Sequence, residues 1–501
     1  MLRNGIDEYM LPETCTIDIF CDIINRLNNY NMKKQSLNSR KPAIGVFGIM
    51  QELYDKDLPG ITERQEGYAR QVIGQISDVA DFTFPRAARN RDDIDEILGD
   101  FNHQGLDGVM IIMLTYGPGM RTVKAFQKNN LPVLLANIQP VPEVTTDWDM
   151  ADLTYNQGIH GAQDTANALL RTIGENFEVI SADWKSDEFK SYVDQWAHAA
   201  HAANALSRMK VAAIGKMHGM GDTLSDEAAF TRVIGPEVNR EYIGEVYRCM
   251  EAVSVVAIEK QMEVERKRFK VDEKMPDKNF RYAVRMYLGF KAFLEQGNYS
   301  AFSAHFDVFK GDGRFQQIPM LAASNLMAEG YGYAAEGDTN TASMVAAGHL
   351  IADYAHFTEM YAMDFKRQSM LMSHMGEGNW KIARKDKPIR LADRVLGIGD
   401  LDNPPTPVFM AEPGPATMVS LVHLAGEHFR LVVTKGEILD TEEYPTIEMP
   451  YFHFKPDSGL RACNDGWLKA GGTHHQVLHL GDHREKWLMF CNILNIEFLE
   501  V

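Results

Sequence analysis

Short apolar runs alternate with amphipathic stretches over the first part of the chain, up to about residue 208. The apolar runs are bounded by polar residues, Gly or Pro, which is typical of buried strands, and they lie at 43–49, 79–84, 107–113 and 132–138. Helical periodicity fills the segments near 62–77, 92–103 and 119–129, and a separate amphipathic helix is predicted over 14–34. Strands that alternate with helices predict a parallel α/β sheet.

A second unit of this kind begins with the apolar run 210–215. It continues through long charged helices predicted near 249–272 and 277–296 to a further run at 301–306. Beyond about residue 390, β-branched and aromatic runs separated by Pro and Gly are typical of an antiparallel sheet or barrel. We therefore predict two doubly wound α/β domains, over 1–208 and 209–355, followed by a C-terminal β-rich, barrel-like domain over 356–501.

Ligands of an open parallel sheet bind beyond the carboxyl ends of its strands. In the first predicted domain this places the binding region around Met50–Tyr54, Tyr116–Met120 and Ile138–Val141.

The net charge limits which kinds of partner the protein can bind, and the cysteine content indicates its cellular compartment. Asp and Glu outnumber Lys and Arg by 69 to 51, a net charge of −18, which argues against nucleic acid and suits a small neutral substrate or a bound cation. The five cysteines form no CxxC pair, and neither a signal peptide nor an apolar run long enough to span a membrane is evident. A cytoplasmic protein without membrane contact is predicted.

Two glycine-rich loops, at 215–222 and 310–319, invite comparison with phosphate-binding loops. Neither has the spacing GxGxxG or GxxxxGK[ST]. An ordinary strand-to-helix turn explains the first loop, and a helix that starts after Pro319 explains the second.

The segment 330–380 is richer in chemistry because it supplies two carboxylates and an imidazole, from Glu336, Glu359 and His374. This donor set suits Mn²⁺, Co²⁺, Fe²⁺ or Mg²⁺. A GGxHH turn near the end of the chain could return His475 to this group as a fourth ligand. A purely structural alternative stays open: Glu336 could cap the helix that starts near Asp338, and Glu359 could lie on a solvated face.

The chain resembles L-arabinose isomerases and the wider L-fucose/L-arabinose isomerase fold group over nearly its whole length. Four motifs carry the resemblance in the family's order, GYGYAAEGD (330–338), FTEMY around Glu359, SHMGE (373–377) and GGTHH (471–475). The resemblance implies a divergent member, an Mn²⁺-dependent aldose–ketose isomerase whose four metal ligands match Glu336, Glu359, His374 and His475. The two glutamates would also move the proton between C1 and C2 through a cis-enediol.

Further positions match sugar-contacting residues of that family. MQELY (50–54) looks like SQHLYG, NQGIHG (156–161) like NQTAHG, and LTYGPGM (114–120) like HTFSPAKM, while two further positions match apolar pocket residues. The implied substrate-binding residues are Gln51, Leu53, Tyr54, Tyr116, Gln157, His160, Met220 and Phe306. Glu52 and Leu114 stand where the family has histidines, and HMLEVCP reads HMGEGNW here.

The leading substrate is L-arabinose, converted to L-ribulose. The alternatives are another sugar, such as L-fucose, D-arabinose or a deoxy sugar, or a non-catalytic sugar-binding protein. The family also implies a homo-oligomer, a hexamer built as a dimer of trimers, with active sites shared between subunits.

Overall fold

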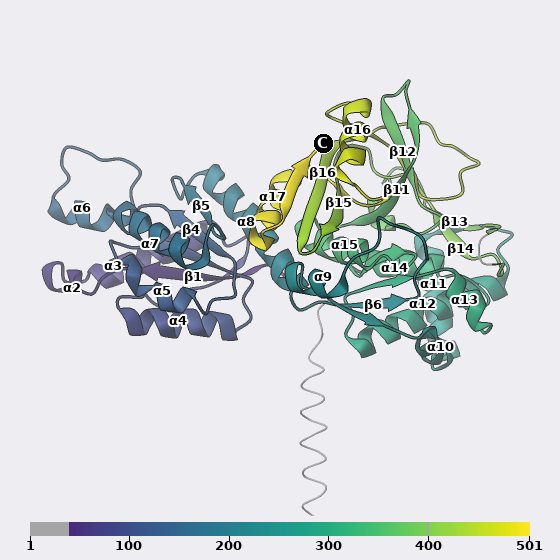
Figure 1. Cartoon of the computed structure of the whole chain (residues 1–501), viewed down its shortest axis with the longest axis horizontal. Helices are drawn as coiled ribbons and strands as arrows, with labels where there is room; N and C mark the ends of the chain where they lie inside the picture. The colour runs from purple at the N-terminus through teal and green to yellow at the C-terminus, as the bar shows by residue number, and fades with distance from the viewer. Residues whose placement is uncertain (1–39, 398–399) are drawn as a thin grey trace, which may run out of the picture. The chain divides into compact units, whose positions relative to one another are not determined.

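Figure 1 shows the computed structural model of the chain, which describes residues 40–397 and 400–501. The helix predicted over 14–34 lies outside the described residues. The described chain contains two parallel α/β sheets and a C-terminal antiparallel barrel, so the predicted fold class is confirmed.

The first sheet is parallel, with strand order β2-β1-β3-β4-β5. Its strands are β1 (Ala43–Ile49), β2 (Asp81–Thr83), β3 (Gly108–Met113), β4 (Val133–Asn137) and β5 (Glu178–Ser181). The first four fall within the predicted apolar runs. The short, half-exposed β5 was not predicted, because EVIS carries little of the hydrophobic signal of a buried strand.

Helices cover both faces of this sheet. On one face α4 (Arg91–His103), α5 (Val123–Phe126) and α7 (Gly158–Ile173) share a core with side chains such as Phe47, Ile111 and Leu135. On the other, α8 (Asp187–Leu206) crosses β1, β3 and β5, and its buried Trp196 lies over Gly108, where an added Cβ would approach the indole to 2.8 Å. The remaining helices are α2 (Tyr54–Asp57), α3 (Ile61–Gln75), η2 (Gly119–Arg121) and α6 (Met150–Asn156).

The second sheet is also parallel, with order β10-β9-β6-β7. It contains β6 (Lys210–Ile214), β7 (Glu237–Arg240), β9 (Ala301–Ala304) and β10 (Gly332–Ala335), and its helices are α9 (Glu227–Val233), α10 (Ile243–Glu251), α11 (Val255–Arg268), α12 (Asp277–Gly297), α13 (Asp307–Asp312) and α14 (Met320–Ala328). The helix expected after Pro319 is therefore present, as α14.

The single helix predicted over 249–272 is wrong. The chain forms α10 and α11 instead, with a break at 252–254. Ser254 has extended backbone geometry, and its Oγ accepts a hydrogen bond from the backbone N–H of Ala257, so this serine caps a new helix. The hydrophobic period alone does not reveal such a restart.

The C-terminal barrel has six antiparallel strands, ordered β15-β18-β11-β12-β17-β16 and closed by pairing of β15 with β16. They are β11 (His356–Asp364), β12 (Ser369–Ser373), β15 (Gly414–Ala425), β16 (His428–Ile438), β17 (Tyr451–Pro456) and β18 (His475–Leu480). The last strand, β19 (Glu497–Glu500), adds parallel to β16. Helices α16 (Leu460–Ala470) and α17 (Arg484–Leu494) accompany the barrel, and β8 (Lys270–Val271), β13 (Arg390–Asp393) and β14 (Pro405–Val408) form a small separate sheet; η3 (Trp380–Ile382) precedes β13.

Helix α15 (Thr339–Ile351) is buried along its whole length. It contacts β6, β9 and β10 of the central sheet, β11, β15 and β18 of the barrel, and α8 of the first domain. Its residues are mostly small or apolar, as expected for a helix whose every face meets protein. It therefore fixes the end of β10 relative to the barrel strands, which is where the candidate site lies. Within the described residues, no helix combines the length and the hydropathy needed to cross a membrane.

Buried histidines make the fold sensitive to acid. Burial lowers the pKa of His479, on β18, to about 3 and that of His349, on α15, to about 4, below the ordinary value of 6.5. The unfolded chain therefore binds protons below pH 6.5 that the folded chain does not. Each of these histidines contributes stability that is complete above pH 6.5 and decreases as the pH falls, by about 1.4 kcal/mol per pH unit below pH 6.

We predict that His479→Gln flattens the dependence of stability on pH between 6.5 and 5, whatever it does to stability at pH 7. Urea unfolding at a series of pH values measures that slope. His428→Gln, at an exposed position on β16, is the matched control and should keep the parental slope. Equal slopes for both variants and the parent would contradict the assignment.

Candidate functional site

The structure brings the four predicted ligands together from separate parts of the chain. Glu336 follows β10, Glu359 lies in β11, His374 follows β12 directly, and His475 is the first residue of β18. Strand register explains three of these placements. In the barrel, Glu359 is paired with His475 on one side and with Ser373, the neighbour of His374, on the other.

The donor atoms of these four residues lie near one another in pairs. Nε2 of His475 is 3.3 Å from Oε1 of Glu359 and 3.6 Å from Oε2 of Glu336, and Nε2 of His374 is 3.9 Å from Oε1 of Glu359. Two overlapping groups have their ligand atoms within 4.8 Å of one another: Glu336 with His474 and His475, and Glu359 with His374 and His475.

A tight turn after β10 brings the fourth residue, Glu336, to the other three. Glu336 and Gly337 both have left-handed backbone, with φ of 65° and 86°. At Gly337 a Cβ would approach the carbonyl oxygen of Gly215 to 2.6 Å, so this position requires glycine. The carbonyl of Glu336 also accepts a hydrogen bond from the N–H of Met217 (2.9 Å), which ties the turn to the loop after β6.

The turn also decides between the two roles considered for Glu336. Asp338, not Glu336, is the N-cap of α15: its Oδ1 accepts from the N–H of Thr341 at 3.0 Å. Glu336 therefore does not cap the helix. The side chains of Glu336 and Glu359 are only 20% and 17% exposed. Neither carboxylate lies on a solvated face.

Two carboxylates that sequence analysis did not identify stand behind the imidazoles. Oδ2 of Asp338 lies 2.9 Å from Nδ1 of His475, and Oε2 of Glu377 lies 2.6 Å from Nδ1 of His374. A carboxylate on Nδ1 fixes the imidazole so that its Nε2 lone pair faces a metal. The signal was present in the sequence, since Asp338 and Glu377 belong to the same short motifs as the ligands, but spacing alone does not distinguish a ligand from its support.

His474 was seen in the sequence only as the neighbour of His475. Its Nε2 lies 3.9 Å from Glu336 and 3.7 Å from Glu359, and its Nδ1 is 2.6 Å from Oδ2 of Asp222. Asp222 ends the glycine-rich loop 215–222, and it also accepts from the N–H of His474. The glycine-rich loop, predicted to be an ordinary strand-to-helix turn, therefore also supports His474 beside the predicted ligands.

The electrostatics of the group favour a cation. The imidazoles of His474 and then His475 lower the pKa of Glu336, which stays ionised. Burial lowers the pKa of His475, but the carboxylates of Asp338, Glu336 and Glu359 outweigh it and raise that pKa well above 6.5. A divalent cation would replace the protons that these imidazoles otherwise hold.

The residues fit such an ion. His475 is fully buried, and its Nε2 makes no hydrogen bond of good geometry to any described residue although it faces two carboxylates. Two carboxylate oxygens and two imidazole nitrogens suit divalent metals of intermediate hardness. Glu336, Glu359, His374 and His475 could hold such an ion, and His474 belongs to one of the two groups whose atoms are close enough.

A small apolar cavity of about 40 Å³ adjoins this group. Phe306, predicted as an apolar pocket residue, lines it together with Glu336 and His374. Met220 lies in the loop after β6, two residues before Asp222. It is half-buried, and it is not among the residues that line the cavity.

The other predicted sugar-binding residues gather at the carboxyl ends of the first sheet. Close backbone approaches hold these segments together: a Cβ on Gly117 would meet the carbonyl of Met50 at 3.3 Å, and one on Gly158 would meet that of Met113 at 2.6 Å. The residues concerned, from half-buried to exposed, are Gln51, Leu53, Tyr54, Tyr116, Gln157 and His160. Within the described chain, no hydrogen bond or ion pair joins any of them to the four predicted ligands.

Leu114, which stands where the family motif has a histidine, is a core residue in this structure. Its side chain is fully buried, and it packs where a Cβ on Gly48 would come within 2.8 Å. It belongs to the core. Glu52, by contrast, is exposed at the same end of the sheet, where Nδ2 of Asn90 lies 3.4 Å from its Oε2.

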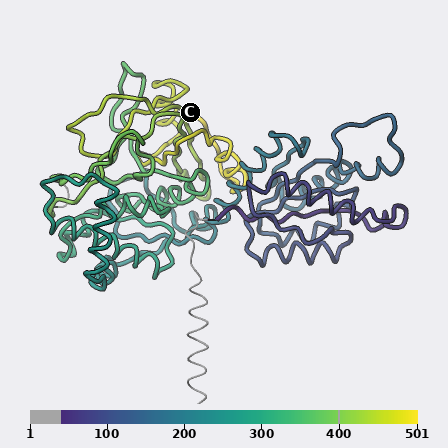
Figure 2. Tube along the Cα trace, turned by 180° about the vertical axis from the view of Figure 1, so that it is seen from behind, coloured from purple at the N-terminus to yellow at the C-terminus, as the bar shows by residue number. Residues whose placement is uncertain are grey.

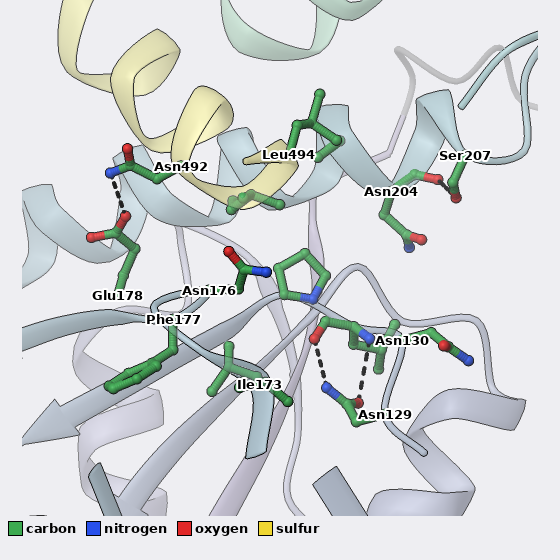
Figure 3. A pocket seen from close by; sticks show the side chains of 15 residues that line it. Asn129, Asn130, Ile173, Asn176, Phe177, Glu178, Asn204, Ser207, Asn492 and Leu494 are labelled. Carbon is green, nitrogen blue, oxygen red and sulfur yellow. Dashed lines mark hydrogen bonds between the residues drawn. The ribbon is translucent and has the colours of Figure 1, made fainter. Parts of the chain in front are cut away.

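A larger pocket, of about 420 Å³, lies elsewhere and contains none of the predicted site residues (Figure 3). Asparagines dominate its polar lining, and Asn492 of α17 donates to Glu178 of β5 across it at 2.8 Å. Figure 2 traces the same chain from behind, with the C-terminal α17 beside segments of the first domain.

Comparison with known proteins places this geometry in a family. Models of the L-arabinose isomerase N-terminal, central and C-terminal domains match residues 46–208, 210–354 and 354–497. Three similar proteins are L-arabinose isomerase of Serratia proteamaculans (28% identical over 486 residues, 92% of this chain and 95% of that one), L-arabinose isomerase 1 of Bacillus licheniformis (29% over 462 residues, 89% and 91%) and L-arabinose isomerase of Yersinia pseudotuberculosis (30% over 411 residues, 78% and 80%).

Among solved structures, a periplasmic solute-binding protein of an ABC transporter from Actinobacillus succinogenes with bound D-allose is similar at 11% identity over 62% of this chain and 90% of that one. Its TM-score of 0.16 is too low to support a structural argument. The three domain matches and the relatives, which agree with the motifs at 330–338, 373–377 and 471–475, are decisive: the chain belongs to the L-arabinose isomerase family of sugar isomerases, as a divergent member.

Proposed function

We propose that this protein is a metal-dependent aldose–ketose isomerase that converts L-arabinose to L-ribulose. The observation that carries the proposal is the convergence of Glu336, Glu359, His374 and His475, with each imidazole backed by a buried carboxylate. A sugar-binding protein without catalysis has no need of such a group.

The reaction moves a proton between C1 and C2 and exchanges a carbonyl for a hydroxyl through a cis-enediol. Removing a proton next to a carbonyl needs a base within about 3 Å, and returning it to the neighbouring carbon needs an acid. We assign both tasks to Glu336 and Glu359, whose carboxylates reach the group from the central sheet and from the barrel. A divalent cation, when bound, stabilises negative charge that develops on the two oxygens of the enediol.

We propose Mn²⁺ as the metal, with Co²⁺, Fe²⁺ or Mg²⁺ as ions that would suit the same ligands. His374 and His475 would serve as neutral ligands whose Nδ1–H groups remain on Glu377 and Asp338. The apolar wall that includes Phe306 would face the part of the sugar that does not react. Met220, in the loop after β6, would contact the sugar from outside this cavity.

The first domain would supply the polar contacts that a polyol requires. Gln51, Tyr54, Gln157 and His160 would hold the hydroxyl groups of the open chain, while Leu53 and Tyr116 would shape the pocket. Because these residues lack contacts to the metal group within the described chain, we propose that they act in the site of a neighbouring subunit, in a hexamer of two trimers.

The family gives the reaction more support than the substrate. Identity to relatives named for L-arabinose is only 28–30% for the three proteins described above. The exposed Glu52 at the sugar end of the first sheet favours the second candidate, an isomerase of another sugar such as L-fucose, D-arabinose or a deoxy sugar.

We also propose the domain extents 1–208, 209–355 and 356–501, which the matched ranges 46–208, 210–354 and 354–497 support. A cytoplasmic location is proposed as well. Cys249, Cys463 and Cys491 are buried free thiols, which suits a reducing compartment.

Replacing either catalytic carboxylate should remove the activity without unfolding the protein. We expect Glu336→Gln and Glu359→Gln each to lower turnover by about 100-fold or more, because the proton transfer loses its base. Assay of ketose formation measures this, and circular dichroism checks the fold. Glu437→Gln, at an exposed position on β16, should retain parental turnover; near-parental turnover in either test variant would refute the assignment.

A panel of sugars separates the two candidate substrates. With Mn²⁺ present, kcat/KM should be highest for L-arabinose among the pentoses and 6-deoxyhexoses. A higher kcat/KM for L-fucose, D-arabinose or another member of the panel would replace the substrate while keeping the reaction. No turnover of any of these sugars would favour the binding-protein alternative.

Subunit mixing tests whether the first domain acts in a neighbouring site. Two inactive variants, Tyr54→Ala and Glu359→Gln, should regain activity when they are dissociated and reassembled together. In a head-to-tail ring with random mixing, about a quarter of the sites would receive both intact halves. If the mixture stays as inactive as its parts while each variant still assembles, both halves of the site belong to one subunit.

A further inference from the structure

A buried chain of hydrogen bonds stands behind one of the proposed ligands. The hydroxyl of Tyr333 donates to Oε1 of Glu377 at 2.6 Å, and Oε2 of the same carboxylate lies 2.6 Å from Nδ1 of His374. All three side chains are buried, with Tyr333 only 1% exposed. Each oxygen of Glu377 thus has its own donor.

The hydroxyl of Tyr333 is held in a fixed place. Its ring packs against Phe302 (centroids 5.0 Å apart) and edge-on against Phe357 (5.7 Å), and both phenylalanines are fully buried. Phe357 in turn lies 4.6 Å from the ring of His374 and 4.9 Å from that of His475. Burial, with the charge of Glu377 next in size, raises the pKa of Tyr333 well above 10, so the hydroxyl remains a donor.

The backbone that carries Glu377 is also fixed. Gly376 has φ of 149°, and a Cβ there would come within 3.1 Å of Met320 and Thr406. The N–H of Gly378 donates to Oγ of Ser324 at 3.2 Å, and Arg394 donates to the carbonyl of Met375. What the backbone leaves undetermined is the rotation of the Glu377 carboxylate about its last bonds.

The two supporting carboxylates differ in how that rotation is restrained. Asp338 is restrained by its own helix, since Oδ1 accepts the N–H of Thr341 while Oδ2 serves His475. Glu377 belongs to no helix, and the corresponding restraint on Oε1 comes from the hydroxyl of Tyr333. Tyr333 thus restrains the carboxylate that holds His374, as the first turn of α15 restrains the carboxylate that holds His475.

We propose that Tyr333 is a positioning residue of the metal centre. By occupying one oxygen of Glu377 it directs the other to Nδ1 of His374, and the Nε2 lone pair then faces Glu359. This inference rests on the proposed function, because it requires that His374 bind the metal. Strand β10 accordingly supplies the positioning hydroxyl, and the turn three residues further along supplies the ligand Glu336.

The test is Mn²⁺ binding to the full-length Tyr333→Phe protein, which loses one oxygen atom and keeps the ring. The electron paramagnetic resonance signal of free aqueous Mn²⁺ gives the Kd without any sugar or turnover. Loss of a supporting partner costs about 10-fold or more in metal affinity, so we expect Kd to rise about 10-fold. Tyr331→Phe removes a hydroxyl two residues away that has no hydrogen bond to another described residue, and its Kd should equal that of the parent.

A second variant shows whether Tyr333 acts through Glu377. Glu377→Gln should weaken Mn²⁺ binding by itself, and adding Tyr333→Phe to it should weaken binding no further. This pair also keeps the test valid if Tyr333→Phe alone folds poorly, as a thermal melt of the metal-free protein would reveal.

The outcomes are distinct. An unchanged Kd in Tyr333→Phe, or losses that add in the double variant, would overturn the role of Tyr333 while leaving the proposed function in place. A parental protein that binds no Mn²⁺, and no Co²⁺, Fe²⁺ or Mg²⁺ that competes for the site, would instead remove the metal centre and with it the proposed function.

Discussion

The carboxylate of Asp338 is the interaction on which the arrangement of the site depends. One oxygen begins α15 and the other holds the imidazole of His475, so a single side chain links the central sheet to the barrel. Because α15 is buried on every side, its start cannot shift without moving β10 and β18 as well. The distances between Glu336 and the barrel ligands follow from that link.

Sequence reasoning reached the layers of the fold because hydrophobic periodicity is local. It identified four strands of the first sheet and the β-rich end of the chain, but missed β5, whose residues are half exposed, and the helix break before Val255, which a serine cap creates. The pairing of Glu359 with both His475 and Ser373 is a matter of register, which sequence spacing does not contain.

In the candidate site too, some residues could be predicted from the sequence and others only from the structure. Its four predicted ligands could be named from motifs, since their residue types and order are distinctive. Asp222, Asp338, Tyr333 and Glu377 could not, because a supporting carboxylate or hydroxyl is recognised only by what it touches. The glycine-rich loop 215–222 is the clearest instance: its spacing indicated only an ordinary strand-to-helix turn, whereas in the structure Asp222 of this loop contacts His474.

The left-handed backbone of Glu336 affects which residues this turn favours for folding alone. A side chain at φ of 65° costs roughly 1 kcal/mol or more relative to glycine, which adopts that conformation freely. For stability alone, glycine or asparagine would therefore suit this position better than glutamate. Folding alone therefore does not account for a glutamate in this turn, and the contacts of its carboxylate with the histidines at the start of β18 are what the position offers in return.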